Sequence, residues 1–159
     1  IDEARELLLR HKLTYRKFWE WAMQNQNGGL LGLTLQTTYG WTWQAGAGTQ
    51  VNPRSLLNWP MQANGAEMMR LACCELTERG GMVCCPVHDA LLVEGPADSI
   101  DDVIAVTRAA MEHASELVLG KGFIVKTDVD IVRHPDRYAD EAGIEMWDRV
   151  MAILEARGW

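Results

Sequence analysis

Two apolar runs separated by two polar residues restrict this chain to folds that contain antiparallel strands. The runs cover residues 82–87 and 90–94, and His88 and Asp89 lie between them. So short a polar joint between two strand-length runs is typical of a tight β-hairpin, in which the neighbouring strands are antiparallel. The pattern therefore predicts a hairpin with a histidine and a carboxylate at its tip.

Periodic patterns predict the remaining elements. Apolar residues recurring at intervals of three and four predict helices over residues 2–27, 53–79, 99–117 and 144–156. β-branched and aromatic residues predict a second hairpin from residues 33–38 and 41–44, and alternation predicts a strand over residues 125–132. Hairpins that supply the strands, with helices between them, favour the α+β class: an antiparallel β-sheet built from hairpins and backed by helices.

Several local signals refine these elements. Asn-Gly-Gly at 27–29 predicts the end of the first helix, and Pro60 predicts a kink or a break near Trp59 in the second. Ser99 and Asp102 resemble a capping box with Asp in the Glu position. The last helix is expected to turn four apolar side chains inward: Trp147, Val150, Met151 and Leu154.

Length and composition describe one domain or a large piece of one. The chain has 159 residues, of which 48% are hydrophobic, so it can bury a core. No apolar run approaches the roughly 20 residues of a membrane span, and the start has neither a signal-peptide core nor an initiator Met. We expect a cytoplasmic protein without a membrane partner, cut from something longer.

The net charge of −7 argues against nucleic-acid binding, because a protein that neutralises phosphates usually has a basic face. The acidity, however, belongs to the second half. Residues 1–79 carry 8 Lys and Arg against 7 Asp and Glu, whereas residues 80–159 carry 7 against 15. A nearly neutral first half can still face DNA.

The four cysteines form two adjacent pairs, Cys73-Cys74 and Cys84-Cys85. Zinc ligands are usually two to four residues apart, and neighbouring side chains in a helix or strand point apart. Buried, reduced thiols are the expected state. A metal-binding regulator built on these cysteines is an alternative that would require stoichiometric zinc.

Asp89 is the strongest local candidate for chemistry. A carboxylate at the end of two buried strands has a fixed backbone and faces solvent, which suits a hard cation such as Mg²⁺. The alternative is an ordinary turn aspartate, since Asp tolerates turn geometry and can bond its own backbone.

Arg54, Asn58 and Gln62 are spaced four residues apart and line one face of the second helix. Asn and Gln can donate to the acceptors that every base pair presents in the minor groove, and Arg can reach these acceptors or phosphate. Such a row would hold a duplex without reading its sequence. A solvated helix face is the alternative.

Read together, these two features resemble a known family. Residues 54–67, RSLLNWPMQANGAE, are similar to the helix of family A DNA polymerases, the bacterial DNA polymerase I type, that carries Arg, then Asn, then Pro-(Met/Ile)-Gln. About 25 residues later, Val87-His88-Asp89 resembles motif C of that family. More weakly, residues 123–132 resemble its last palm strand, and the segments 136–138 and 145–147 resemble its closing segment.

The resemblance implies roles for these residues. Asp89 would bind the catalytic metals of a two-Mg²⁺ site, with the other ligands outside this chain. His88 would lie near the primer terminus, and Arg54, Asn58 and Gln62 would line the primer-template minor groove. Residues 1–45 would follow the fingers, and residues 46–159 would form the carboxyl-terminal palm subdomain.

The implied function is that of a fragment of a DNA-directed DNA polymerase, which transfers nucleotides from dNTP to a primer 3′-hydroxyl. Its partners would be primer-template DNA, dNTP and the remaining fingers, thumb and palm segments. Ala90 replaces the usual Glu after the motif C Asp, and the motif A Asp and the fingers helix are absent, so the chain alone is expected to be inactive. Possible stand-in carboxylates are Glu94, Asp128 and Asp130. A non-catalytic duplex-binding module, a palm relic or accessory subunit, is the alternative.

Overall fold

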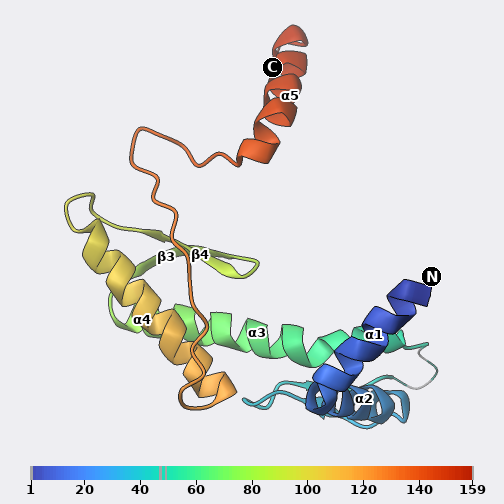
Figure 1. Cartoon of the computed structure of the whole chain (residues 1–159). Coiled ribbons are helices and arrows are strands. Elements are labelled where there is room, and N and C mark those ends of the chain that lie inside the picture. The colour runs from blue at the N-terminus through green and yellow to red at the C-terminus, as the bar shows by residue number, and fades with distance from the viewer. Residues whose placement is uncertain (1, 47, 49, 159) are drawn as a thin grey trace. The chain divides into compact units, whose positions relative to one another are not determined.

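The computed structural model describes residues 2–46, 48 and 50–158 and forms two compact units, Ile1–Thr127 and Asp128–Trp159 (Figure 1). The elements of the first unit are α1 (Asp2–Thr14), α2 (Arg16–Leu30), β1 (Leu35–Gln36), β2 (Thr42–Trp43), α3 (Pro53–Glu78), β3 (Met82–Val87), β4 (Ala90–Glu94) and α4 (Ile100–Leu119). The second unit contains the 3₁₀-helix η1 (Glu141–Gly143) and α5 (Ile144–Ala156). The division predicted at residues 45 and 46 stays a prediction.

The helix predicted over residues 2–27 is two helices, and its predicted end is wrong. The backbone leaves helical geometry at Tyr15, which separates α1 from α2. α2 then continues through Gly29, where a Cβ would lie 2.5 Å from Leu56 Cδ2, so the missing side chain lets α2 approach α3. Gly32, with φ of 77°, follows the helix and supplies the left-handed conformation common at helix ends.

The long helix α3 forms the centre of the first unit and packs against α2 and α4. The side chain of Asn52 caps it by accepting from Arg54 N at 2.9 Å, and Pro53 occupies its first turn. Pro60 lies within the helix without splitting it, so of the two predicted outcomes the break is wrong and the kink stays a prediction. The buried apolar side chains of α3 and α4 are Leu56, Ala63, Ala72, Leu76, Ala110, Ala114 and Val118.

The capping box predicted at the start of α4 is wrong. Ser99 occupies the N-cap position, but its side chain makes no capping hydrogen bond. Its backbone carbonyl instead accepts from Asp102 N at 3.1 Å and Val103 N at 3.2 Å.

Both predicted hairpins are confirmed, and the α+β class with them. β1 pairs with β2 and β3 pairs with β4, each antiparallel, and the two pairs form separate two-stranded sheets. α3 packs against both β3 and β4, so the second hairpin is backed by a helix.

The strand predicted over residues 125–132 is wrong. This segment has no strand assignment in the described structure, and a strand needs a partner for its backbone groups. Its first part is instead attached to α4, because Val125 N donates to Ser115 Oγ at 3.0 Å and Arg108 Nη2 donates to the Thr127 carbonyl at 2.9 Å.

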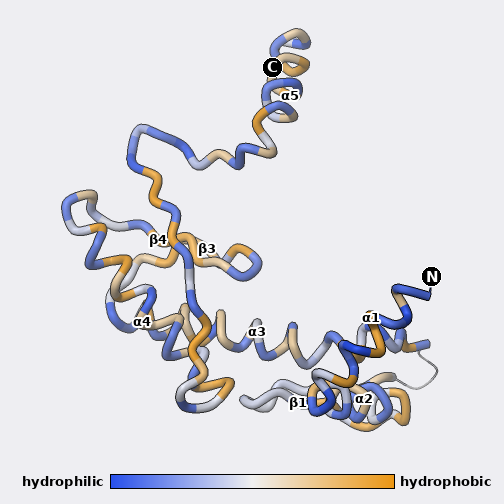
Figure 2. The backbone as a smooth tube through the Cα atoms, in the orientation of Figure 1, coloured by the Kyte–Doolittle hydropathy of each residue, from blue (hydrophilic) through white to orange (hydrophobic). Residues whose placement is uncertain are grey.

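The helix predicted over residues 144–156 is confirmed as α5, but the predicted burial of its apolar face is wrong. Trp147 is 64% exposed, and Val150, Met151 and Leu154 are exposed as well. Figure 2 shows hydrophobic and hydrophilic residues side by side along α5. None of the helices in the described part of the chain has the length and apolar character needed to cross a membrane.

Candidate nucleic-acid interface

His88 and Asp89 form the two-residue turn of the second hairpin. Val87 pairs with Ala90, so the turn has the length that the sequence predicted. His88 has φ of 55°, in the left-handed region of backbone conformation, which residues other than Gly adopt at a cost of roughly 1–2 kcal/mol. Both residues are exposed, and Asp89 therefore presents its carboxylate to solvent rather than to the core.

The strands below the turn hold this tip in place. Their register runs from Val87 opposite Ala90 to Met82 opposite Glu94, with a bulge between Val83 and Cys85. Glu94 lies four residues along β4 from Ala90, about 13 Å at 3.3 Å per residue. Metal–oxygen bonds of roughly 2.0–2.6 Å cannot join carboxylates so far apart, so Glu94 is not a stand-in ligand beside Asp89.

Arg54, Asn58 and Gln62 are all exposed on α3. At about 100° per residue, each step of four turns by about 40°, so the three side chains follow one slowly winding stripe. The buried residues of this half of the helix, Leu56, Pro60, Ala63 and Glu67, lie on its opposite side. Among the described residues, no hydrogen bond or ion pair engages the three side chains of the stripe, which leaves their donors available.

The tip and the stripe belong to the same unit. The chain reverses at Gly80-Gly81, where Gly81 N donates to the Leu76 carbonyl at 2.9 Å, and β3 then runs back along α3 (Figure 1). Six residues of strand extend about 20 Å, and the helix from Gln62 to Glu78 measures about 24 Å. The tip therefore reaches roughly the level of Gln62, while Arg54 lies a further 12 Å or so along the helix.

Asp89 is the one carboxylate that the described residues place at the tip of the second hairpin. They contain no group of three or more His, Cys, Asp or Glu side chains placed to hold a metal ion. Mg²⁺ in phosphate-transfer sites is commonly held by one or two carboxylates together with water and substrate phosphates. The side chain of Asp89 is of the type that can occupy one such position.

All four cysteines are free thiols, but the prediction that they are buried is wrong. Cys74 and Cys84 are exposed, and Cys73 and Cys85 are partly buried. Burial raises the pKa of the Cys73 thiol, and the neighbouring Cys74 raises it further.

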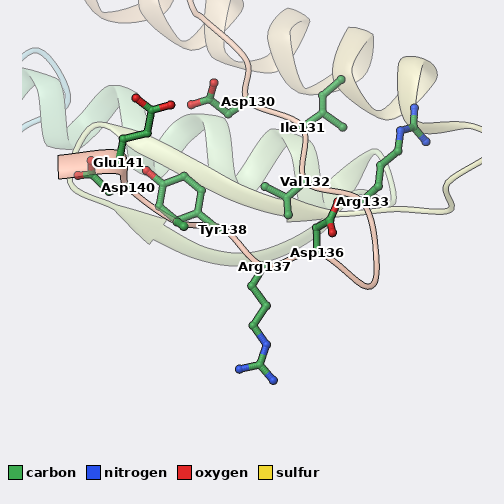
Figure 3. Close-up of a pocket in the computed structure, with 10 residues that line it drawn as sticks. Asp130, Ile131, Val132, Arg133, Asp136, Arg137, Tyr138, Asp140 and Glu141 are labelled. Carbon is green, nitrogen blue, oxygen red and sulfur yellow. The ribbon is translucent and has the colours of Figure 1, made fainter. Parts of the chain in front are cut away.

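The second unit has a cavity of about 550 Å³ around the 136–138 segment. Asp130, Asp136, Asp140 and Glu141 line it together with Arg133, Arg137 and Tyr138. Figure 3 shows the Arg137 side chain extending away from the other labelled residues. Among the described residues, these carboxylates do not form a group of three or more side chains placed to hold a metal ion.

A second cavity, of about 450 Å³, lies in the first unit and was missed from the sequence. Tyr39, Gly40 and Trp41 line it from the turn between β1 and β2, and Ala66, Glu67 and Arg70 line it from α3. The sequence signal that could have pointed to this cavity is the spacing of four residues on α3, because Ala66 and Arg70 continue the series Arg54, Asn58 and Gln62.

These features define an α+β protein in which a hairpin presents one carboxylate beside a helix with an exposed polar stripe. No family model matches the chain. Curated relatives match part of it: 72 residues are 33% identical to DNA polymerase I of Deinococcus radiodurans, covering 43% of this chain and 8% of that protein. Stretches of 70 residues are 36% identical to the thermostable DNA polymerase I of Thermus caldophilus and of Thermus thermophilus, covering 42% of this chain and 8% of each relative.

The chain thus spans less than a tenth of the length of these relatives. A segment of it is similar to bacterial DNA polymerase I, as the resemblance of residues 54–67 and 87–89 predicted.

Proposed function

We propose that this chain is a palm segment of a DNA-directed DNA polymerase and that Asp89 is one of its catalytic metal ligands. The observation that carries the proposal is the exposed carboxylate at a two-residue hairpin turn, roughly at the level of Gln62 in the exposed Arg-Asn-Gln stripe of α3. The partial similarity to DNA polymerase I supports the same assignment.

The stripe explains how such an enzyme would hold its substrate. Asn58 and Gln62 have free amide donors that match the minor-groove acceptors common to all base pairs, and Arg54 adds a positive charge for phosphate. A copying enzyme must hold a primer terminus of any sequence, so contacts that do not discriminate between bases suit it. His88, adjacent to Asp89, would lie near that terminus.

The hairpin explains how the carboxylate would act. The antiparallel pairing of the two strands directly beneath the turn limits the movement of Asp89, and a ligand that is already in place loses little freedom on binding a cation. Bound Mg²⁺ would activate the primer 3′-hydroxyl and stabilise the leaving pyrophosphate of the dNTP. Because this chain contributes a single ligand, purified alone it is expected not to extend a primer.

A substitution at Asp89 tests the proposal in the complete polymerase. Asp89→Asn removes the charge but keeps the shape, and we expect primer extension to fall on the order of a thousandfold while binding to primer-template DNA is retained. Glu94→Gln is the matched control, because it removes a carboxylate from the far end of the same strand. Extension that survives Asp89→Asn would remove Asp89 from the mechanism.

A non-catalytic duplex-binding module is the second candidate. Ala90 follows Asp89 where the family usually has Glu, so a carboxylate that could assist catalysis is missing at that place. The adjoining coding sequence distinguishes the two: an upstream Asp-Tyr-Ser-like motif and a Lys-bearing helix with Tyr-Gly would support the enzyme. Duplex binding without these segments would support the module.

A further inference from the structure

The exposed stripe on α3 extends beyond the three residues that the sequence singled out. Ala66 and Arg70 continue the spacing of four after Gln62, and both are exposed. From Gln62 to Arg70 the helix rises about 12 Å. The stripe therefore passes from an Arg-Asn-Gln face to a second arginine on the same winding path.

At this end the stripe meets the turn between β1 and β2. Tyr39, Gly40 and Trp41 line the 450 Å³ cavity together with Ala66 and Arg70. Tyr39 is 44% exposed and Trp41 is 57% exposed, although both side chains are large and apolar. Aromatic side chains left open to solvent beside an arginine are the chemical features that hold unpaired nucleobases, because any base can stack on a ring and the cation can reach its phosphate.

A buried carboxylate fixes the turn in this position. Glu67 is 2% exposed, and its two oxygens accept from Thr37 Oγ1 at 2.7 Å and from Tyr39 N at 3.0 Å. Trp41 N donates to the same Thr37 hydroxyl at 2.9 Å. Glu67 thus acts as a positioning residue: its oxygens bond to the turn, and Arg70 is the cation among the residues that line the cavity.

We propose that this cavity binds an unpaired nucleobase of the DNA strand that leaves the duplex, stacked on Trp41, with Arg70 on the adjacent phosphate. The inference rests on the proposed function, since it places the base next to a duplex held by Arg54, Asn58 and Gln62. It adds a single-strand contact to the duplex contact further along α3, at a position about 80° around the helix from Gln62.

Fluorescence anisotropy with the full chain tests this contact. Two labelled DNA probes are compared at fixed salt: a blunt duplex, and the same duplex with a short single-stranded overhang. Wild-type protein is expected to bind the overhang probe more tightly than the blunt duplex. Trp41→Ala is expected to lower the affinity for the overhang probe by about fivefold to a hundredfold while leaving the affinity for the blunt duplex unchanged. Trp41→Phe should restore most of the preference, because it keeps a stacking ring.

Two further measurements distinguish stacking from a change in fold. 2-Aminopurine placed in the overhang should be quenched on binding to wild-type protein and not to Trp41→Ala. Arg70→Ala should lower the dependence of log K on log salt for the overhang probe by about one unit, whereas Arg70→Lys should keep it. Trp147→Ala is the matched control, because Trp147 is 64% exposed on α5 and should change neither probe.

The outcomes separate the two proposals. Equal affinity of wild-type protein for both probes, or an overhang preference that survives Trp41→Ala, overturns the nucleobase site while leaving the duplex contact intact. Failure of wild-type protein to bind either probe overturns the duplex contact and the nucleobase site together.

Discussion

Replacing Glu67 by alanine should destabilise the first unit more than any surface substitution on α3. Glu67 is buried and accepts two hydrogen bonds, from Thr37 Oγ1 and Tyr39 N. A hydrogen bond to a charged group contributes about 1.5–3 kcal/mol, so the two together contribute roughly 3–6 kcal/mol. Removal of the carboxylate also removes its own desolvation cost, and we expect a net loss of about 3 kcal/mol in the free energy of unfolding.

Urea denaturation of the full chain, followed by circular dichroism, measures this loss. The midpoint should fall while the m-value stays constant, and the melting temperature should fall by roughly 6–12 °C. Glu67→Gln keeps one acceptor oxygen and should lose about half as much. Hydrogen exchange should show the amides of Tyr39 and Trp41 exchanging faster in both variants, because the turn loses its attachment to α3.

Glu78→Ala is the matched control, since Glu78 is an exposed residue near the end of the same helix. Its effect should stay within about 0.5 kcal/mol. If Glu67→Ala were no more destabilising than Glu78→Ala, the carboxylate would not be what holds the hairpin turn on α3, and the preordered cavity would lose its support.

Two further predictions concern packing and thiol reactivity. Gly81→Ala would place its Cβ 2.4 Å from Leu76 Cδ1 and 3.0 Å from the Leu76 carbonyl oxygen, so it should lower the free energy of unfolding by about 1–3 kcal/mol in urea titrations. A Cβ at Gly65, in contrast, meets nothing within 4 Å, and Gly65→Ala should raise the free energy of unfolding by up to about 1 kcal/mol. The raised pKa of Cys73 leaves less thiolate at neutral pH, so iodoacetamide should label Cys73 more slowly than Cys74. The difference between the two labelling rates, measured by tandem mass spectrometry, should narrow as the pH rises. Equal labelling rates at neutral pH would contradict this prediction.

The two elements that carry the candidate site were predictable because their signals are local. A two-residue polar joint between apolar runs fixes a hairpin turn whatever surrounds it, so His88 and Asp89 could be placed at a tip from the residues alone. Asn52 and Pro53 mark the start of α3, and a spacing of four places Arg54, Asn58 and Gln62 on one face.

Features that depend on residues distant in the sequence were decided by the tertiary structure. Gly29 is a stop signal by composition, yet α2 passes through it, and its missing side chain leaves room for Leu56 of α3. Residues 125–132 alternate like a strand, but no neighbouring strand pairs with them in the described structure, and a backbone without a partner does not form a sheet.

The nucleobase site belongs to the same category. Arg70 and Trp41 are unremarkable in sequence, and they line one cavity only because a carboxylate on α3 accepts hydrogen bonds from a turn 28 to 30 residues earlier. Periodicity alone determined which residues share a helix face or a hairpin tip. Which faces meet, and which charge is buried between them, was determined by packing, because those energies arise from contacts that no single segment contains.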